Sequence, residues 1–293
     1  MTDQKRVLGF IGGSGVYSVD ALENPKKIVV TTPWGEPSDA LVRGKLAGIE
    51  VVFLARHGNG HRIPPSDVNY RANIDAMKRL GVTDIISISS CGSFREDLAP
   101  GSFVIVDQFV DRTTMREKSF FGSGFVAHVS MADPVCPALA SALTESCAAL
   151  NIDHASAGTY LAIDGPQFSS RAESHLYRSW GCDVIGMTNM PEAKLAREAE
   201  IPYATLAMVT DYDCWRENTG PVEVGHILET MQKNTENAAR LVADLIPRLG
   251  TTRKPSPLGI ETVLDMAVIT PPNARDQSMT RKLNVIAGRY LNR

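Results

Sequence analysis

Short apolar runs, each long enough for one buried strand, recur along most of the chain. Between them lie stretches in which apolar residues fall three or four positions apart, the spacing of a helix with one buried face. Such alternation is typical of an α/β protein whose sheet is covered by helices. The predicted strands are Val7–Ile11, Lys27–Thr32, Gly48–Ala55, Thr83–Ser93, Gly101–Val110, Gly158–Ile163 and Ile201–Thr210.

Helix signals separate several of these strands. The first predicted helix is capped by Ser66 or Asp67 and ends at Gly81, because a small polar residue opens a helix and glycine commonly closes one. A second helix is predicted at Pro137–Leu150, and a third opens at Pro191.

Two carboxylates follow the last of the predicted strands, at Asp211 and Asp213. In an extended chain, side chains two positions apart point to the same side, and open α/β sheets bind ligands at the carboxyl ends of their strands. Taken alone, two acids in such a place are more often helix caps or partners of basic residues. The pair therefore needs support from the rest of the chain.

Other strand ends and one helix start carry groups that can hydrogen-bond an anion. The glycine-rich segment Gly12–Gly15 is either an anion-binding nest or a tight turn, and it is not a GxGxxG motif. Arginine offers a rigid fork of donors suited to phosphate, and a helix N-terminus favours negative charge. These groups are Ser14, Arg56 with His57, Ser89 with Ser90, and Thr188.

Composition excludes several classes of function. With 43% hydrophobic and 22% charged residues and a net charge of −3, the 293-residue chain is ordinary globular material without an electrostatic case for nucleic acid. Its first apolar run is too short for a signal sequence or a membrane span. Five cysteines without a CxxC pair favour reduced thiols. We therefore expect a cytoplasmic protein, with no nucleic-acid or membrane partner.

Taken in order, the motifs resemble one family, the 5′-methylthioadenosine phosphorylases of the purine nucleoside phosphorylase superfamily. The resemblance runs from about Val7 to Gly250. The ordered series is far more specific than any single motif. The motifs are Ile11–Gly15, Ala55–Gly58, Cys91–Ser93, Asp107–Arg116, Gly165–Glu173, Met187–Glu192 and Thr210–Trp215.

The resemblance implies a fold and a reaction. The fold is α/β, with one domain at 1–250 built on a central mixed sheet flanked by helices, and an extension at 251–293 packed on this domain or on a neighbouring subunit. The reaction is attack of phosphate on C1′ of methylthioadenosine, which releases adenine and leaves 5-methylthioribose 1-phosphate, as in purine and methionine salvage. Phosphate is a co-substrate, and neither a metal nor an organic cofactor is implied.

Roles for individual residues follow from the same resemblance. Asp211 would protonate purine N7, since burial beside a second acid raises a carboxyl pKa, while Asp213 would recognise the 6-amino group. Met187 would contact the ribose. Phe168 would pack against the nucleoside, although a phenylalanine in a turn closes a loop against the core about as often. The phosphate-binding positions would be Ser14, Arg56, His57, Ser89, Ser90 and Thr188.

Other matched positions concern the 5′ end of the substrate and the assembly. Ser169, Val224 and Ile227 match positions linked to 5′ specificity, and an apolar wall there would prefer S-CH₃ to a hydroxyl. Val224 and Ile227 belong to the apolar face of a helix predicted to start near Val222, and from Met231 onward this face is interpreted as core. His128 matches a residue that the family contributes to a neighbouring active site, which implies a homotrimer or a homohexamer.

The chain departs from the family at Gln167, where many relatives have arginine. Its C-terminal part is basic, with seven Lys/Arg against three Asp/Glu in 251–293. There we expect a linker at Thr251–Pro257, a short helix or strand at Ile260–Ile269 that closes a 5′ pocket, and a basic helix at Thr280–Arg293. That helix packs on a neighbouring subunit or is a frayed end.

Two other functions compete with methylthioadenosine phosphorolysis. The nearer is phosphorolysis of 6-oxopurine nucleosides, including methylthioinosine, although such enzymes of the superfamily have Asn where this chain has an acid. The more distant is a nucleoside-binding protein without catalytic activity.

Overall fold

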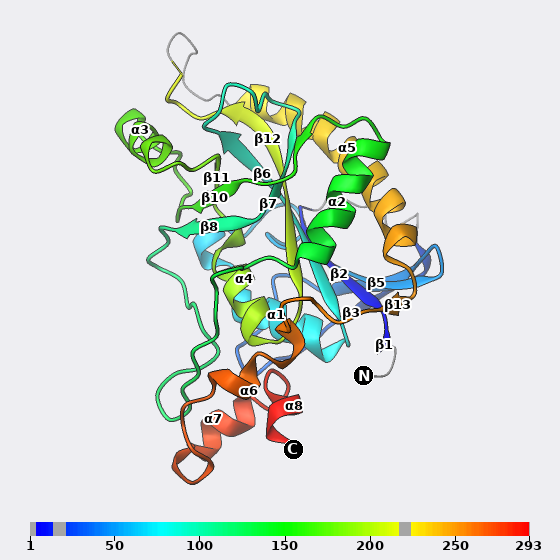
Figure 1. Ribbon diagram of the computed structural model, residues 1–293, viewed down its shortest axis with the longest axis vertical. Coiled ribbons are helices and arrows are strands. Elements are labelled where there is room, and N and C mark those ends of the chain that lie inside the picture. The colour runs from blue at the N-terminus through cyan, green and yellow to red at the C-terminus, as the bar shows by residue number, and fades with distance from the viewer. Residues whose placement is uncertain (1–3, 14–21, 217–223, 293) are drawn as a thin grey trace.

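The computed structural model describes residues 4–13, 22–216 and 224–292, with the backbone alone at 224–228. A large mixed sheet of eleven strands forms the centre of this part of the chain (Figure 1). Its strands are β2 (Val7–Gly12), β3 (Glu23–Ile28), β4 (Leu41–Leu46), β5 (Ile49–Ala55), β6 (Asp84–Ser93), β7 (Phe103–Val106), β8 (Gln108–Asp111), β9 (His154–Ala155), β10 (Thr159–Ala162), β11 (Val184–Gly186) and β12 (Tyr203–Tyr212).

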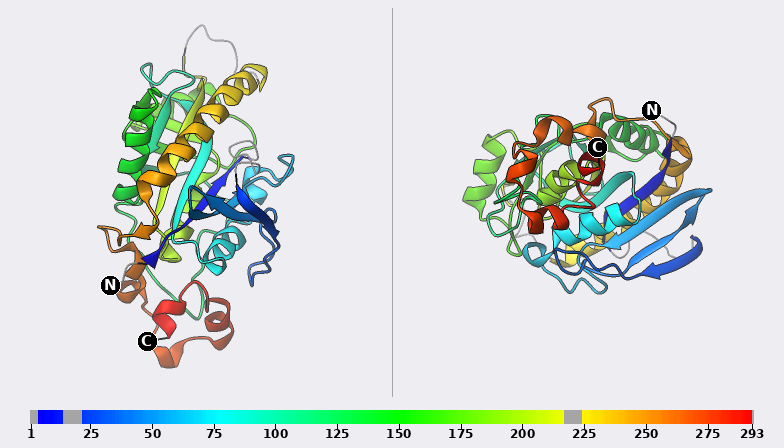
Figure 2. Two further views of the ribbon diagram at one scale, coloured as in Figure 1. Left: turned by 90° about the vertical axis from the view of Figure 1, so that its right-hand side faces the viewer. Right: turned by 90° about the horizontal axis from the view of Figure 1, so that it is seen from below.

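Helices cover both faces of this sheet (Figures 1 and 2). On one face α2 packs beside α5, and their residues Leu143 and Leu245 belong to one core cluster. On the other face α1 packs beside α4, and their residues Ile74 and Leu195 belong to a second core cluster. The helices are α1 (Tyr70–Arg79), α2 (Pro137–Ala149), α3 (Arg171–Ser179), α4 (Asn189–Glu198), α5 (Val224–Leu249), α6 (Leu264–Ala267), α7 (Gln277–Lys282) and α8 (Gly288–Leu291), with short 3₁₀ turns η2 (Pro65–Asp67), η3 (Ile260–Thr262) and η4 (Pro272–Ala274).

The sheet branches at β6, which runs along β12 on one edge and meets two different strands on the other. On that second edge, β2 pairs in parallel with the first half of β6 up to Ser87. There β11 pairs antiparallel only with Gly92 and Ser93. The backbone edge of Ile88–Cys91 therefore faces neither strand, and an opening forms where β2 and β11 diverge. Ligands of α/β sheets bind at such a change in strand order.

The α/β class, the mixed sheet and the flanking helices are as predicted, but several boundaries are not. The first alternating strand starts earlier than expected, at Glu23, because the exposed edge strand β3 pairs with β4. Strand β4 is not among the strands predicted from the sequence. The predicted strand Gly101–Val110 is broken at Asp107, whose carboxylate accepts a hydrogen bond from the Gly158 N–H, so that β7 joins β12 while β8 joins β10.

The cap predicted for the first helix is also wrong. Asn69 caps α1, and its side chain accepts a hydrogen bond from the Ala72 N–H. Ser66 and Asp67 instead lie in η2, where the Ser66 hydroxyl donates to the Asp164 carbonyl. A polar residue can therefore look like a helix cap in sequence while its hydrogen bonds go to a distant loop.

The C-terminal extension differs from the sequence prediction in two places. The predicted linker contains a strand, β13 (Thr252–Arg253), which pairs antiparallel with β1 (Gln4–Lys5). The predicted helix Thr280–Arg293 is two short helices, α7 and α8, because Asp276 caps α7 early and the chain then turns to bury Leu283 and Ile286. Ile260–Ile269 forms η3 and α6, the helical alternative.

Contacts hold this extension against the rest of the chain at one end of the molecule (Figure 1). Arg253 is buried between Asp84, at 3.0 Å, and Glu261. Arg289 forms an ion pair with the buried carboxylate of Glu200, which also accepts from the Leu264 N–H. The packing is thus intramolecular in part. A domain boundary at residue 250 stays a prediction.

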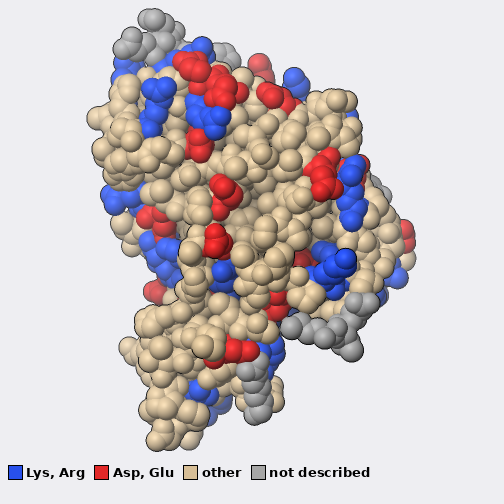
Figure 3. Space-filling view, viewed as in Figure 1, with Lys and Arg blue, Asp and Glu red and all other residues tan. Residues whose placement is uncertain are grey.

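The surface and the helices add two observations. On the face drawn in Figure 3, basic and acidic side chains are scattered among uncharged ones. None of the described helices has the length and apolar character needed to cross a membrane. All five cysteines are free in the structure.

We predict that Arg253→Met lowers the free energy of unfolding by about 3 kcal/mol, because it leaves the buried Asp84 with one cationic partner, Arg6, instead of two. Urea unfolding followed by circular dichroism measures this change. Arg248→Ala is the matched control, since Arg248 pairs with Asp244 at the surface of α5. Equal unfolding midpoints for the two variants would contradict the structural role of Arg253.

Candidate active site

A cavity of about 470 Å³ occupies the opening between β2 and β11. It is lined by the unpaired part of β6, the chain after β5, the loop before α3, the start of α4, the end of β12 and one side of α5. The branching of the sheet thus brings together segments that are up to about two hundred residues apart in the sequence.

Most of the predicted site residues line this one cavity. His128 does not: it is exposed in the loop before α2, where its backbone N–H donates to the Ala267 carbonyl of the extension. Ser14 lies outside the described residues, as do the side chains of Val224 and Ile227. The predicted residues that do line the cavity are Arg56, His57, Ser89, Ser90, Phe168, Ser169, Met187, Thr188, Asp211 and Asp213.

Arg56 is the most completely buried charge at the cavity wall, with 1% of its surface exposed. Its Nε and Nη2 bond both carboxylate oxygens of Glu192, at 2.7 and 3.0 Å. Nη2 also reaches the Ile11 carbonyl and the Ser87 hydroxyl, and Nη1 donates to the Ile88 carbonyl. A guanidinium has five N–H groups, so among the described residues one Nη1 hydrogen remains for a ligand.

His57 is uncharged at neutral pH. Burial and the charge of Arg56 together lower its pKa to about 4, although a hydrogen bond to the Ile63 carbonyl acts in the opposite direction. That carbonyl lies 2.8 Å from Nδ1, so Nδ1 carries the hydrogen. The ring stacks on His61. Its other nitrogen, Nε2, can donate to an anion only after taking up a proton.

The two acids at the end of β12 face the cavity from the side of Gly92. A β-bulge between Val209 and Asp211 shifts the register there, and a Cβ on Gly92 would lie 3.2 Å from Asp211 Oδ2. The Thr210 hydroxyl donates to Asp211 Oδ1 at 2.7 Å. Asp213 Oδ2 is buried without a hydrogen-bond partner among the described residues. A buried acceptor of this kind is expected to meet a donor from a ligand.

The environment of these acids favours their protonated forms. Burial, with a smaller contribution from the nearby charge of Asp213, raises the pKa of Asp211 to about 6 against the opposing effect of the Thr210 hydroxyl. Burial also raises the pKa of Asp213. Asp211 therefore has the pKa of a group that can exchange a proton near neutral pH.

The apolar part of the wall includes one residue that the sequence interpretation missed. The interpretation of Met231 as helix core is wrong. Met231 and Thr235 of α5 line the cavity, while Ala238 is buried on the sheet. The stripe to which the predicted 5′ residues Val224 and Ile227 belong reaches Met231 one turn later. Helical spacing could therefore have identified it.

Phe168 lies at the mouth of the cavity, in the loop between β10 and α3. Half of its surface is exposed. The alternative that it closes the loop against the core is therefore wrong. Gln167 beside it is exposed and is not part of the cavity wall.

A second hollow, of about 530 Å³, lies at the surface between α3 and the segment after β6. Its arginines and acidic groups already have partners: Arg95 pairs with Asp97 and Asp183, Glu96 pairs with Arg216, and Arg178 donates to the Phe94 carbonyl. This hollow therefore lacks the free convergent groups of the first cavity.

The comparison with known protein families agrees with this arrangement. The model of the phosphorylase superfamily matches residues 7–247, which include the whole cavity wall. The chain belongs to the phosphorylase superfamily. The resemblance inferred from the motifs is thereby confirmed.

Individual relatives place the chain more narrowly among the phosphorylases. It is 56% identical over 287 residues to the S-methyl-5′-thioadenosine phosphorylase of Cereibacter sphaeroides, covering 98% of this chain and 99% of that protein. It is also 56% identical over 285 residues to the enzyme of that name from Rhodospirillum rubrum, covering 97% of each. These alignments include most of the extension, so the similarity continues past Gly250.

Solved structures of phosphorylases support the same fold. A methylthioadenosine phosphorylase from an Antarctic soil metagenomic library is 46% identical, has a TM-score of 0.90, and the match covers 97% of this chain and 99% of that one. The methylthioadenosine phosphorylase of Schistosoma mansoni, solved in complex with adenine, is 35% identical with a TM-score of 0.83, covering 93% and 99%. The nucleoside phosphorylase fold is confirmed.

We predict that Asp211→Asn stabilises the ligand-free phosphorylase by about 1–3 kcal/mol at neutral pH. The folded-state pKa lies above the ordinary value of 3.8, so the contribution of Asp211 to stability falls as the pH rises from 3.8 to about 6. The neutral amide avoids this loss. Below the ordinary pKa the two proteins should be equally stable.

Urea unfolding at a series of pH values measures the difference, with Asp133→Asn, in an exposed loop, as the control. A variant that is less stable than the wild type at neutral pH would show that the Asp211 carboxylate is well satisfied in the folded state.

Proposed function

We propose that the protein catalyses the phosphorolysis of 5′-methylthioadenosine, giving adenine and 5-methylthioribose 1-phosphate. The observation that carries this proposal is that one cavity holds a carboxyl group with a raised pKa, Asp211, together with the cationic Arg56 and several hydroxyl groups. A leaving purine needs an acid, and an attacking phosphate needs donors. The relatives, which bear the name of this activity at up to 56% identity, support the substrate.

At the purine end, Asp211 acts as the general acid. As the bond between C1′ and N9 breaks, electrons move into the purine ring, and Asp211 supplies a proton to N7. Asp213 accepts a hydrogen bond from the 6-amino group through Oδ2, the buried oxygen that has no partner in the described structure. An acceptor at this place suits a 6-aminopurine, whose amino group donates, better than a 6-oxopurine.

At the other end, an unprotonated phosphate oxygen attacks C1′ and forms the new C–O bond. The free Nη1 hydrogen of Arg56 binds the phosphate, together with Ser90, Thr188 and, on its family match, Ser14. Ser89 completes this subsite, together with His57, which donates to the phosphate only when Nε2 carries a proton. Because Glu192 already balances the charge of Arg56, the phosphate keeps much of its own negative charge, which stabilises the oxocarbenium-like transition state.

The remaining wall fits the sugar and its 5′ group. Met187 contacts the ribose and Phe168 packs on the nucleoside, while Ser169 lies near the 5′ end. Met231 extends the apolar 5′ wall that we assign to Val224 and Ile227. A methylthio group is preferred there to a hydroxyl, which would lose its hydrogen bonds with water.

We propose that the enzyme is a homotrimer, or a homohexamer built from two such trimers, in which His128 completes the site of a neighbouring subunit. His128 is exposed beside an extension that presents Met266 and Ile269, which are 92% and 62% exposed. Apolar exposure of this kind is expected at an interface. Light scattering on the purified protein tests the assembly, and a monomeric mass would contradict it.

The activity is tested with methylthioadenosine, adenosine, inosine and methylthioinosine, each with and without phosphate. We expect phosphate-dependent release of free base, with kcat/KM highest for methylthioadenosine and about 10- to 100-fold lower for adenosine. Faster turnover of inosine or methylthioinosine would favour the 6-oxopurine alternative. Binding without turnover of any of them would favour the non-catalytic alternative.

The role of Asp211 is tested by Asp211→Asn. Loss of a general acid should lower kcat for methylthioadenosine about 100- to 10,000-fold, whereas Asp133→Asn should leave it unchanged. Steady-state kinetics at saturating phosphate measures both variants. Full activity of Asp211→Asn would remove the proposed general acid.

A further inference from the structure

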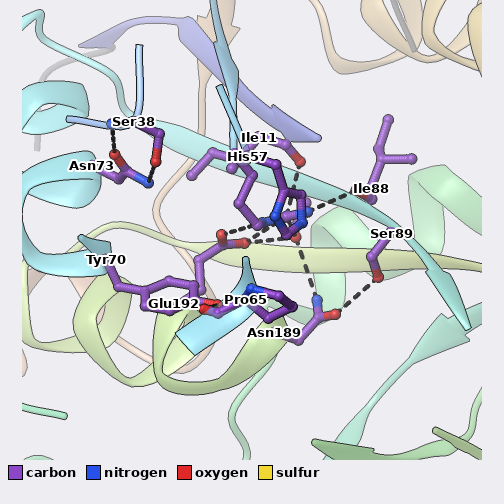
Figure 4. Close-up of polar contacts among 12 residues, drawn as sticks. Ile11, Ser38, His57, Pro65, Tyr70, Asn73, Ile88, Ser89, Asn189 and Glu192 are labelled. Atoms are coloured by element: carbon purple, nitrogen blue, oxygen red, sulfur yellow. Dashed lines mark hydrogen bonds and ion pairs between the residues drawn. The ribbon is translucent and has the colours of Figure 1, made fainter. Parts of the chain in front are cut away.

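The direction of every hydrogen bond leading to Ser89 can be worked out from the Arg56–Glu192 pair (Figure 4). A carboxylate has no hydrogen to give and can only accept. Besides Arg56, the Ser87 hydroxyl reaches Glu192 Oε1 at 2.7 Å, and the Tyr203 hydroxyl reaches the same oxygen at 3.0 Å. Each of these two hydroxyls has a single hydrogen, and each donates it in a hydrogen bond to Glu192.

This requirement fixes the orientation of the Asn189 side chain. One end of its amide lies 3.3 Å from Ser87 Oγ, 3.0 Å from the Tyr203 hydroxyl and 2.7 Å from Thr205 Oγ1. Because Ser87 and Tyr203 have no hydrogen left, the end that faces them must be the NH₂ group. The amide oxygen therefore faces the other way, toward Ser89.

The last step sets the hydroxyl of Ser89. Its Oγ lies 2.9 Å from Asn189 Oδ1, which can only accept, so Ser89 donates its single hydrogen there. Ser89 is 6% exposed and lines the cavity. Ser89 has no hydrogen left for the nearby Tyr160 hydroxyl or for a ligand, so toward both of them it offers only lone pairs. A serine in an anion site normally donates its hydrogen to the anion.

We propose that Ser89 accepts a hydrogen bond from the P–OH group of hydrogen phosphate, and so makes the site selective for phosphate over dianions that carry no hydrogen. This inference rests on the proposed function, which places phosphate beside Ser89. Sulfate has the shape and charge of hydrogen phosphate but lacks the hydrogen. Its oxygen would face the lone pairs of Ser89 without an intervening hydrogen, which is repulsive in a buried site.

The arrangement also orders the oxygens of the bound phosphate. The protonated oxygen, which is the poorest nucleophile of the four, is held at Ser89. The unprotonated oxygens are left for Arg56 and for attack on C1′. Asn189 is then a positioning residue, because it acts on the substrate only through Ser89.

The test compares binding of inorganic phosphate and of sulfate, measured by isothermal titration calorimetry at mildly alkaline pH, where both are dianions. We expect the wild-type enzyme to prefer phosphate by about 10- to 100-fold, the range for one hydrogen bond to a charged group. Ser89→Ala should lose most of this preference, because it removes the hydrogen bond to phosphate and also the repulsion of sulfate. Ser90→Ala, its neighbour in the same cavity, should change both affinities by the same factor.

A second variant gives a readout that a merely structural role would not produce. Asn189→Ala frees the hydrogen of Ser89, which can then donate to either anion, so sulfate should bind more tightly than it does to the wild type. If this variant does not fold, the comparison of Ser89→Ala with Ser90→Ala decides. Equal weakening of phosphate and sulfate by Ser89→Ala would overturn the inference, because it would mean that Ser89 donates.

The outcome is separate from that of the proposed function. Anion binding is measured without nucleoside, so a wild-type enzyme that discriminates as expected but releases no adenine would refute the proposed function alone. Normal phosphorolysis with a phosphate-to-sulfate ratio that Ser89→Ala leaves unchanged would refute this inference alone.

Discussion

The buried ion pair between Arg56 and Glu192 is the interaction on which the arrangement of the cavity depends. Burying either charge alone would cost several kcal/mol, so the end of β5 and the first turn of α4 must meet at one place. The remaining donors of Arg56 hold the carbonyls of Ile11 and Ile88, which flank the point where β2 and β6 separate. The pair thus fixes the opening as well as the charge inside it.

The opposite wall of the cavity is built on less favourable contacts. Asp213 Oδ2 has no hydrogen-bond partner in the described structure, and burial keeps the pKa of Asp211 near 6. A carboxyl in such a place destabilises the empty enzyme, yet it is suited to hold a proton or to accept from a ligand. The cavity therefore combines a well-satisfied anion end with a poorly satisfied acidic end, and a purine nucleoside with phosphate has groups that match both.

The fold class and most residues of the cavity could be predicted from the sequence, because strand ends and short motifs can be recognised locally. Asp211, Asp213, Arg56 and the serines each follow an apolar run, and open sheets gather such ends at one edge. The division of one long strand at Asp107 could not be predicted, since it depends on the hydrogen bond of its carboxylate to a residue far along the chain.

Other features were missed because they depend on how distant segments pack. Asn69 rather than Ser66 caps α1, since Ser66 bonds a loop nearly a hundred residues away. Glu192 and Asn189 lie inside a quoted motif, but only the folded structure puts them beside Arg56 and Ser89. The direction in which Ser89 donates follows from a network of five hydrogen-bonding side chains that begins at Glu192 and ends at Ser89, and no spacing in the sequence encodes that network.

In the proposed reaction phosphate, and not water, attacks C1′ of methylthioadenosine in this cavity. Incubation with phosphate fully labelled with ¹⁸O, followed by mass spectrometry of the sugar product, tests it most directly. We expect one methylthioribose phosphate for each adenine released, with all the labelled oxygens retained, since the new C–O bond uses a phosphate oxygen. Free methylthioribose, formed with adenine at a rate independent of phosphate, would contradict it.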